Sequence, residues 1–256
     1  MKRRQLMGYA GAGLVTALVT NLASGFKATA QSSGSLSVRW LGHTCFLFTG
    51  GGARILVNPF RAVGCTAGYR PPKVVADLVL ISSQLLDEGA VDELRGNPKL
   101  IYEPGVYEFQ GMKFQGIAIE HDRQGGKRFG MNTAWSWKQG GINLLHLGGA
   151  AAPISIEQKI LMGRPDVAFI PVGGGAKAYN AEEAKQAVQI LSPKLVVPTH
   201  YRTQAADTAA CDISPVDEFL TLMQGMTVRR SNGDTITVNS GSLPESGAIQ
   251  VFSYKF

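Results

Sequence analysis

The feature that most constrains the fold is a succession of short β-rich segments between residues 36 and 147. Residues 36–40 alternate apolar and polar side chains, which is typical of a half-buried strand, and residues 77–81 form a largely apolar run that is typical of a buried one. Further strands are predicted at residues 44–48, 54–57, 99–102, 112–120, 132–137 and 142–147. With 45% hydrophobic and 17% charged residues, the composition is that of a globular chain and excludes a disordered one.

The second half of the chain alternates strands with helices. Strands are predicted at residues 167–171 and 195–198, and helices at residues 155–162, 180–191 and 215–224. Asn180 is a natural helix N-cap, with Glu183 in the capping-box position. Two further strands, residues 227–230 and 235–238, flank Asn232-Gly233, which predicts a β-hairpin. Because no break is long enough for a boundary, we predict one α/β domain over residues 36–256.

The first thirty residues resemble an export signal, and residues 31–35 a linker. Arg3 and Arg4 precede a moderately apolar run, and Ala28-Thr29-Ala30 has the small-x-small pattern that signal peptidase accepts. The arginine pair resembles a twin-arginine signal, and both the periplasm and the thylakoid lumen fit such a signal. The alternative is an uncleaved membrane anchor, because the run is about long enough to span a bilayer. No other segment is apolar enough to cross a membrane, so the mature chain is predicted to have no span.

Export would place the three cysteines in an oxidising compartment. Cys45 lies inside an apolar strand and is predicted to be a core residue. Cys65 and Cys211 lie in loop-like sequence and are the candidate disulfide pair, although three cysteines leave other pairings open. No C-x-x-C motif occurs, which gives a redox motif or zinc knuckle no support.

The net charge of +6 does not indicate a nucleic-acid-binding protein. The first thirty residues hold four bases and no acid, which leaves 21 of the 25 bases against 19 acids in the rest of the chain. A balance so close to neutral gives little electrostatic attraction to a polyanion. We therefore expect no nucleic-acid partner.

Four motifs in sequence order resemble those of one family. Trp40-Leu41-Gly42-His43 opens the domain, and Ser82-Ser83-Gln84-Leu85-Leu86-Asp87-Glu88 follows the buried strand. His146-Leu147-Gly148-Gly149 and Pro198-Thr199-His200-Tyr201 end two later strands. Together they resemble the metallo-β-lactamase superfamily, in the branch of ascorbate-6-phosphate lactonase and related small hydrolases. The resemblance covers nearly all of residues 36–205 and implies a four-layer αββα sandwich with metals at the strand ends between the sheets.

The resemblance also implies a ligand set, which this chain matches poorly. Active relatives hold two metal ions through a His-x-His-x-Asp-His signature, a third His, a bridging Asp and a last His. The surviving positions are Asp87, His121 and His200, with Glu88 in the place of the signature's last His. Three other positions carry Ser83, Leu85 and Gly149. Since a leucine cannot bind a metal and Gly149 removes the bridging carboxylate, we expect no dinuclear centre.

One metal ion remains the alternative. Asp87, Glu88, His121 and His200 form a two-histidine and carboxylate set that can hold one Zn, Fe or Mn ion, with Asp87 also the candidate catalytic residue. The competing expectation is that these polar residues bind no metal, that hydrogen bonds hold them in place, and that the protein has no cofactor. By the same resemblance, His43 and His146 are expected to be structural residues.

Basic residues flank the signature strand. If they converge on the cleft, they would make it an anion pocket; they are Arg61, Arg70, Lys73, Lys127 and Arg128. Our main hypothesis is an exported protein of this fold with a degraded metal site, which acts as a binding or scaffold protein for a small anion or another exported protein. The alternative is an enzyme, a hydrolase of a lactone, ester or phosphoester that uses the single residual metal.

Overall fold

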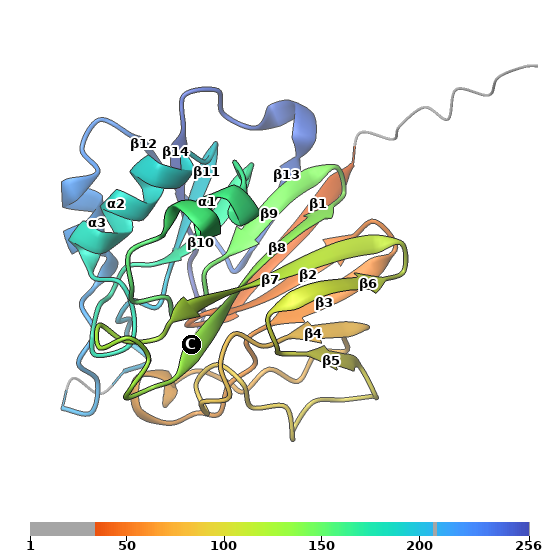
Figure 1. Ribbon diagram of the computed structural model, residues 1–256, viewed down its shortest axis with the longest axis horizontal. Helices are drawn as coiled ribbons and strands as arrows, with labels where there is room; N and C mark the ends of the chain where they lie inside the picture. The colour runs from red at the N-terminus through yellow and green to blue at the C-terminus, as the bar shows by residue number, and fades with distance from the viewer. Residues whose placement is uncertain (1–33, 207–208, 256) are drawn as a thin grey trace, which may run out of the picture. The chain divides into compact units, whose positions relative to one another are not determined.

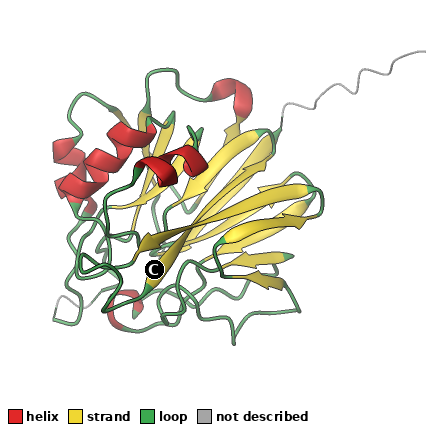
Figure 2. Cartoon of the chain, viewed as in Figure 1, coloured by secondary structure: helices red, strands yellow, loops and turns green. Residues whose placement is uncertain are grey.

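The computed structural model describes residues 34–206 and 209–255, which fold around two β-sheets packed against each other (Figures 1 and 2). The proposed export signal and most of the linker lie outside the described residues. The predicted α/β sandwich is confirmed, and the two sheets share one apolar core.

The first sheet has six strands in the order β13-β1-β2-β3-β4-β5. Strands β1 to β3 are an antiparallel meander, whereas β4 and β5 join in parallel. Their bounds are β1 Ser35–Gly42, β2 Cys45–Gly50, β3 Ala53–Val57, β4 Leu78–Leu80, β5 Lys99–Ile101 and β13 Thr235–Asn239.

The second sheet has eight strands in the order β12-β14-β11-β10-β9-β8-β7-β6. Strands β6 to β9 are antiparallel, and β9, β10, β11, β14 and β12 pair in parallel. Their bounds are β6 Gly105–Phe109, β7 Met112–Glu120, β8 Met131–Gln139, β9 Ile142–His146, β10 Val167–Pro171, β11 Leu195–Thr199, β12 Thr227–Arg230 and β14 Ala248–Val251.

The described residues contain three α-helices and two short 3₁₀ helices. These are α1 Ile156–Met162, α2 Ala181–Leu191, α3 Val216–Leu222, η1 Gly64–Thr66 and η2 Ser240–Ser242. The α-helices group together over the eight-stranded sheet, because α1 contacts β7, α2 contacts β10, and α2 also contacts α1 and α3 (Figure 1). Capping boxes start α1 at Ser155 and α2 at Asn180, the second as predicted. None of these helices is long and apolar enough to cross a membrane.

Aromatic side chains fill the space between the sheets. Phe46 and Phe48 from the first sheet meet Phe169 from the second with ring centroids 4.8 and 5.1 Å apart. Trp135 and Trp137 are both buried and pack in the sheet, as their alternation predicts, and the Trp135 indole donates to the Ile81 carbonyl oxygen at 3.1 Å. This hydrogen bond joins the middle of β8 to the end of β4.

One local prediction is wrong. Asn232-Gly233 does not close a hairpin, because β12 pairs with β14 in the eight-stranded sheet and β13 pairs with β1 in the six-stranded sheet. The chain therefore crosses from one sheet to the other at this turn. The edge strand β6 and the strand β14, which lies between β12 and β11, were not predicted, and a Gly at the start of β6 weakens its strand pattern.

A disulfide joins Cys65 in η1 to Cys211, 146 residues later in the chain. Nearby, the Gly68 amide donates to the Ala205 carbonyl oxygen at 2.7 Å, and the Tyr69 and Thr203 hydroxyls are 2.6 Å apart. Cys45 is a free, fully buried core residue, as predicted. The disulfide and these hydrogen bonds fasten the loop after β3 to the loop after β11.

Candidate metal centre

Four loops at one end of the sandwich carry the candidate site. His43 lies in the turn between β1 and β2, and Asp87 and Glu88 lie in the loop after β4. His121 directly follows β7, and His200 directly follows β11. Because these strands end at the same place, residues that are up to 157 positions apart in the sequence come together.

His43, Asp87 and His200 form the tightest group, here called the His–Asp cluster. One donor atom from each lies within 4.8 Å of the others. The His43 Nε2 is 3.8 Å from Asp87 Oδ2, and the centroids of the His43 and His200 rings are 4.3 Å apart. No ring nitrogen of either histidine has a hydrogen bond, although both side chains are buried. Unpaired buried nitrogens that converge on a carboxylate fit a bound cation.

Glu88 and His121 form a second, fully buried pair beside the cluster. The Glu88 Oε2 lies 3.4 Å from His121 Nε2 and accepts a hydrogen bond from the Ser83 hydroxyl at 3.1 Å. The other carboxylate oxygen, Oε1, and the His121 Nε2 have no hydrogen bond. The Ser83 hydroxyl thus orients the Glu88 carboxylate.

Gly149 packs directly against this pair. A Cβ atom at position 149 would lie 2.1 Å from His121 Cε1 and 2.9 Å from Glu88 Oε1. The His121 ring therefore occupies the position that a side chain at 149 would need, and the Glu88 carboxylate lies beside it. Asn132 fixes this turn by accepting from the Gly149 amide at 2.8 Å and donating to the Leu147 carbonyl oxygen at 2.9 Å.

The backbone at both cluster histidines is strained. His43 has φ 53° and His200 has φ 49°, in the left-handed region that side-chain-bearing residues rarely adopt. Such conformations persist where the surrounding structure holds them, and they gather at functional sites. The loops that the disulfide joins border both residues in the chain: Thr203, three residues after His200, bonds the Tyr69 hydroxyl, and a Cβ at Gly42, beside His43, would lie 2.6 Å from the Tyr69 ring.

Burial keeps the cluster histidines neutral near pH 7. Burial lowers the pKa of His43 to about 4, with Lys177 adding to the effect and Asp87 opposing it. Burial and the neighbouring His43 also lower the pKa of His200. Burial alone would raise the pKa of Asp87, but attraction by His43 and Lys177 lowers it to about 2. Two neutral imidazoles and one carboxylate are the ionisation states that a metal requires.

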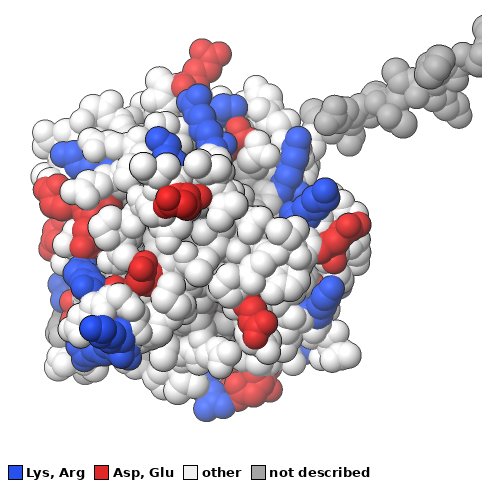
Figure 3. Space-filling model, in the orientation of Figure 1, with Lys and Arg blue, Asp and Glu red and all other residues white. Residues whose placement is uncertain are grey.

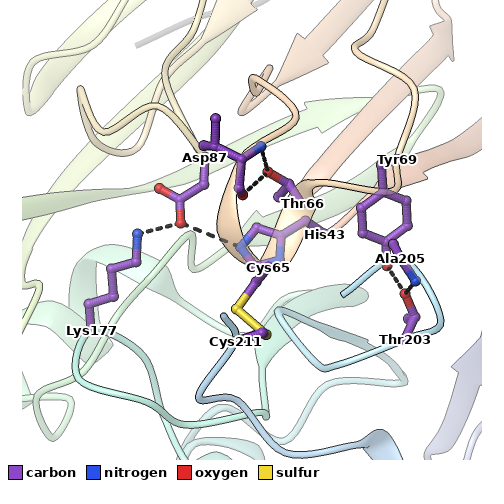
Figure 4. The surroundings of a disulfide bond; sticks show 10 residues. His43, Cys65, Thr66, Tyr69, Asp87, Lys177, Thr203, Ala205 and Cys211 are labelled. Atoms are coloured by element: carbon purple, nitrogen blue, oxygen red, sulfur yellow. Dashed lines mark hydrogen bonds and ion pairs between the residues drawn. A yellow bond between two sulfur atoms is a disulfide. The ribbon is translucent and has the colours of Figure 1, made fainter. Parts of the chain in front are cut away.

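The positive charge at the site comes from Lys177, which the sequence analysis did not single out. Its ammonium is ion-paired with Asp87 (Figure 4). Of the five predicted bases, Arg61 pairs with Asp92, Arg70 donates to the Lys255 carbonyl oxygen, and Arg128 stacks on Phe129. Lys73 and Lys127 are exposed. Acidic and basic side chains are interspersed on the face in Figure 3.

The structure divides the predicted ligand set. Asp87 and His200 come together, as expected, but their third partner is His43 rather than His121 or Glu88. His43 was expected to be a structural residue that forms hydrogen bonds, but neither nitrogen of its ring has a hydrogen bond. His146 does have the expected structural bonds: its Nε2 donates to the Thr44 carbonyl oxygen at 3.0 Å, and its Nδ1 accepts from the Gly148 amide at 3.1 Å.

Comparison with known proteins identifies the family. A family model described as a β-lactamase superfamily domain matches residues 37–200, and the chain belongs to that superfamily. It is 30% identical over 193 residues to a UPF0173 metal-dependent hydrolase from Thermococcus onnurineus, covering 66% of this chain and 85% of the relative. It is 24% identical over 196 residues to a UPF0173 metal-dependent hydrolase from Thermoplasma acidophilum, covering 66% and 84%.

Solved structures show the same fold. A Thermotoga maritima protein of the metallo-β-lactamase superfamily aligns with a TM-score of 0.70 and 27% identity over 86% of this chain and 100% of that one. An isothiocyanate hydrolase from Delia radicum gut bacteria aligns with a TM-score of 0.58 and 10% identity, over 80% of this chain and 100% of that one. The second likeness shows the fold alone.

Replacing Gly149 by Ala tests the packing around Glu88 and His121. The new methyl group would overlap the His121 ring, so we expect the variant to lose about 1–3 kcal/mol of unfolding free energy, as overpacked cores do. Gly241→Ala is the control, because a Cβ there meets nothing within 4 Å and should change stability by less than about 0.5 kcal/mol. Urea unfolding measures both. Equal stability of the two variants would contradict the packing described.

The pH dependence of stability tests the burial of His146. Burial lowers its pKa from about 6.5 to about 3, so the unfolded chain binds more protons between these values. The contribution of neutral His146 to the unfolding free energy is therefore fully present above pH 6.5. It is lost as pH falls toward 3, at up to about 1.4 kcal/mol per pH unit. The His146→Gln variant, which does not titrate, should show a slope shallower by that amount between pH 6 and 5. Identical slopes in urea unfolding would show that His146 is not buried in its neutral form.

Proposed function

We propose that this chain is a metal-dependent hydrolase that uses a single cation held by His43, Asp87 and His200. The convergence of unpaired, buried ring nitrogens on the Asp87 carboxylate supports the proposal most directly. The names of the relatives, which are metal-dependent hydrolases, agree with it. Two imidazoles and a carboxylate suit Zn, Fe or Mn.

The residues present fit one cation and not the two of the active family. Leu85 cannot donate to a metal, and Ser83 is already bonded to Glu88. A bound cation would polarise a carbonyl or phosphoryl oxygen and lower the pKa of a bound water. The substrate class that fits this chemistry is a lactone, an ester or a phosphoester.

Glu88 is the proposed general base. Burial raises the pKa of its carboxyl group, and the neighbouring Asp87 adds to that effect. A raised pKa moves a carboxylate toward the range in which it can accept a proton from water. Ser83 donates a hydrogen bond to Glu88 Oε2, and His121 Nε2 lies 3.4 Å from the same oxygen. Glu88 Oε1 has no hydrogen bond. Asp87, the candidate catalytic residue of the sequence analysis, has the lower pKa and serves as the anionic ligand instead.

A second candidate function is a binding protein without hydrolytic activity. The ion pair between Lys177 and Asp87 supports it, because an ammonium group already neutralises the cluster's carboxylate. The ligand would be a small anion or another exported protein. Such a protein would stay folded and metal-free in the presence of excess metal.

Metal titration separates the two functions. The metal-free chain is expected to bind one equivalent of Zn²⁺ or Mn²⁺ by calorimetry and to hydrolyse chromogenic esters, lactones or phosphoesters only after loading. His200→Ala removes a ligand and should weaken metal binding by more than the roughly 10–100-fold that loss of an outer partner costs. His146→Gln is the control, because His146 is equally buried but already hydrogen-bonded, and it should bind like the unmodified chain. Two equivalents of metal, or none, would contradict the proposal.

We also propose that the chain is exported, with residues 1–30 as the signal and residues 36–256 as the mature domain. The Arg3-Arg4 pair and the Cys65–Cys211 disulfide support this, because disulfides persist in oxidising compartments. Protein isolated from its native cells, alkylated and unfolded without reductant should show one reactive thiol, Cys45, and an N-terminus after Ala30. Three reactive thiols on a chain that still begins at Met1 would contradict export.

A further inference from the structure

Lys177 reaches the His–Asp cluster from the loop between β10 and α2. Its ammonium pairs with Asp87 Oδ2, and the two side chains are 21% and 17% exposed. Its charge also acts on His43, His200 and Glu88. Most lysines of soluble proteins extend into water, so one that is largely buried at a carboxylate needs an explanation.

The oxygen that Lys177 holds is the one that faces the cluster. The same Asp87 Oδ2 lies 3.8 Å from His43 Nε2. A cation that enters between the two histidines and this carboxylate therefore meets an oxygen that already has a cationic partner. Two positive charges at this distance repel each other, and the repulsion is strong where water is excluded.

The loop that carries Lys177 is anchored on both sides of it. Arg123 donates to the Gly175 and Ala178 carbonyl oxygens, each at 2.9 Å, and pairs with Glu183 of α2. The Tyr179 amide donates to the Ala150 carbonyl oxygen at 2.9 Å. These bonds fix the backbone on either side of Lys177, so its position at the cluster is set by the fold.

We propose that Lys177 is the resident cation of this site and competes with a metal ion for Asp87. In the metal-free chain its ammonium neutralises the buried carboxylate, and a metal ion binds by displacing it. Lys177 thereby weakens metal binding and stabilises the metal-free fold. This inference rests on the proposed single-cation site.

The test compares Lys177→Met with the unmodified chain in a Zn²⁺ titration. The variant keeps the length of the side chain and loses its charge, so we expect metal to bind on the order of tenfold more tightly. Without metal, the variant should melt at a lower temperature, because Asp87 has lost its partner. Lys194→Met is the matched control, since Lys194 pairs with Asp166 at 2.9 Å on another part of the fold. It should lower the melting temperature without changing metal affinity.

The outcomes separate this inference from the proposed function. If the unmodified chain binds one metal and Lys177→Met binds it no more tightly, the competition is wrong and the hydrolase proposal stands. If only Lys177→Met binds metal, the competition is correct and the native chain is not a metalloenzyme. If neither binds, both proposals fail. Lys177→Arg, which keeps the charge, should bind metal no more tightly than the unmodified chain. If Lys177→Met does not fold, Lys177→Gln, which also removes the charge, takes its place and should bind metal more tightly.

Discussion

The whole site depends on polar atoms that the fold buries without hydrogen bonds. Six of the ten such side-chain atoms in the described residues belong to His43, Glu88, His121 and His200. Each buried, unpaired group costs about 1–3 kcal/mol, so a fold keeps several together only where other interactions hold them. Here the disulfide, the Asn132 bonds and the packed core fix the strand ends, and the two cluster histidines adopt a strained backbone.

At the positions where the sequence analysis expected missing ligands, neighbouring side chains fill the site. At Gly149 the His121 ring fills most of the space that a side chain would need, and Glu88 Oε1 lies beside that ring. The Ser83 hydroxyl donates to Glu88 and orients it. The proposal has one bound cation rather than two, and the ammonium of Lys177 supplies a positive charge at Asp87. These contacts support the proposal of a rearranged site with one metal ion, in which Lys177 is the resident cation.

The sequence predicted most strands and helices, because local patterns such as the Asn180–Glu183 capping box determine them. It failed at Asn232-Gly233, where the pairing partners of β12 and β13 lie in different sheets and no local signal shows it. Asp87 and His200 could be found by resemblance to the family. The sequence could not place His43 and Lys177 in the same site. Their contacts with Asp87 depend on long-range packing and on a loop conformation, and the spacing of residues along the chain predicts neither.

The most direct test of the account is anomalous diffraction from crystals of the mature chain grown with Zn²⁺. The account predicts one anomalous peak, within bonding distance of His43, Asp87 and His200, with the Lys177 ammonium moved away from Asp87. Two peaks, or a single peak on His121 and Glu88, would contradict it.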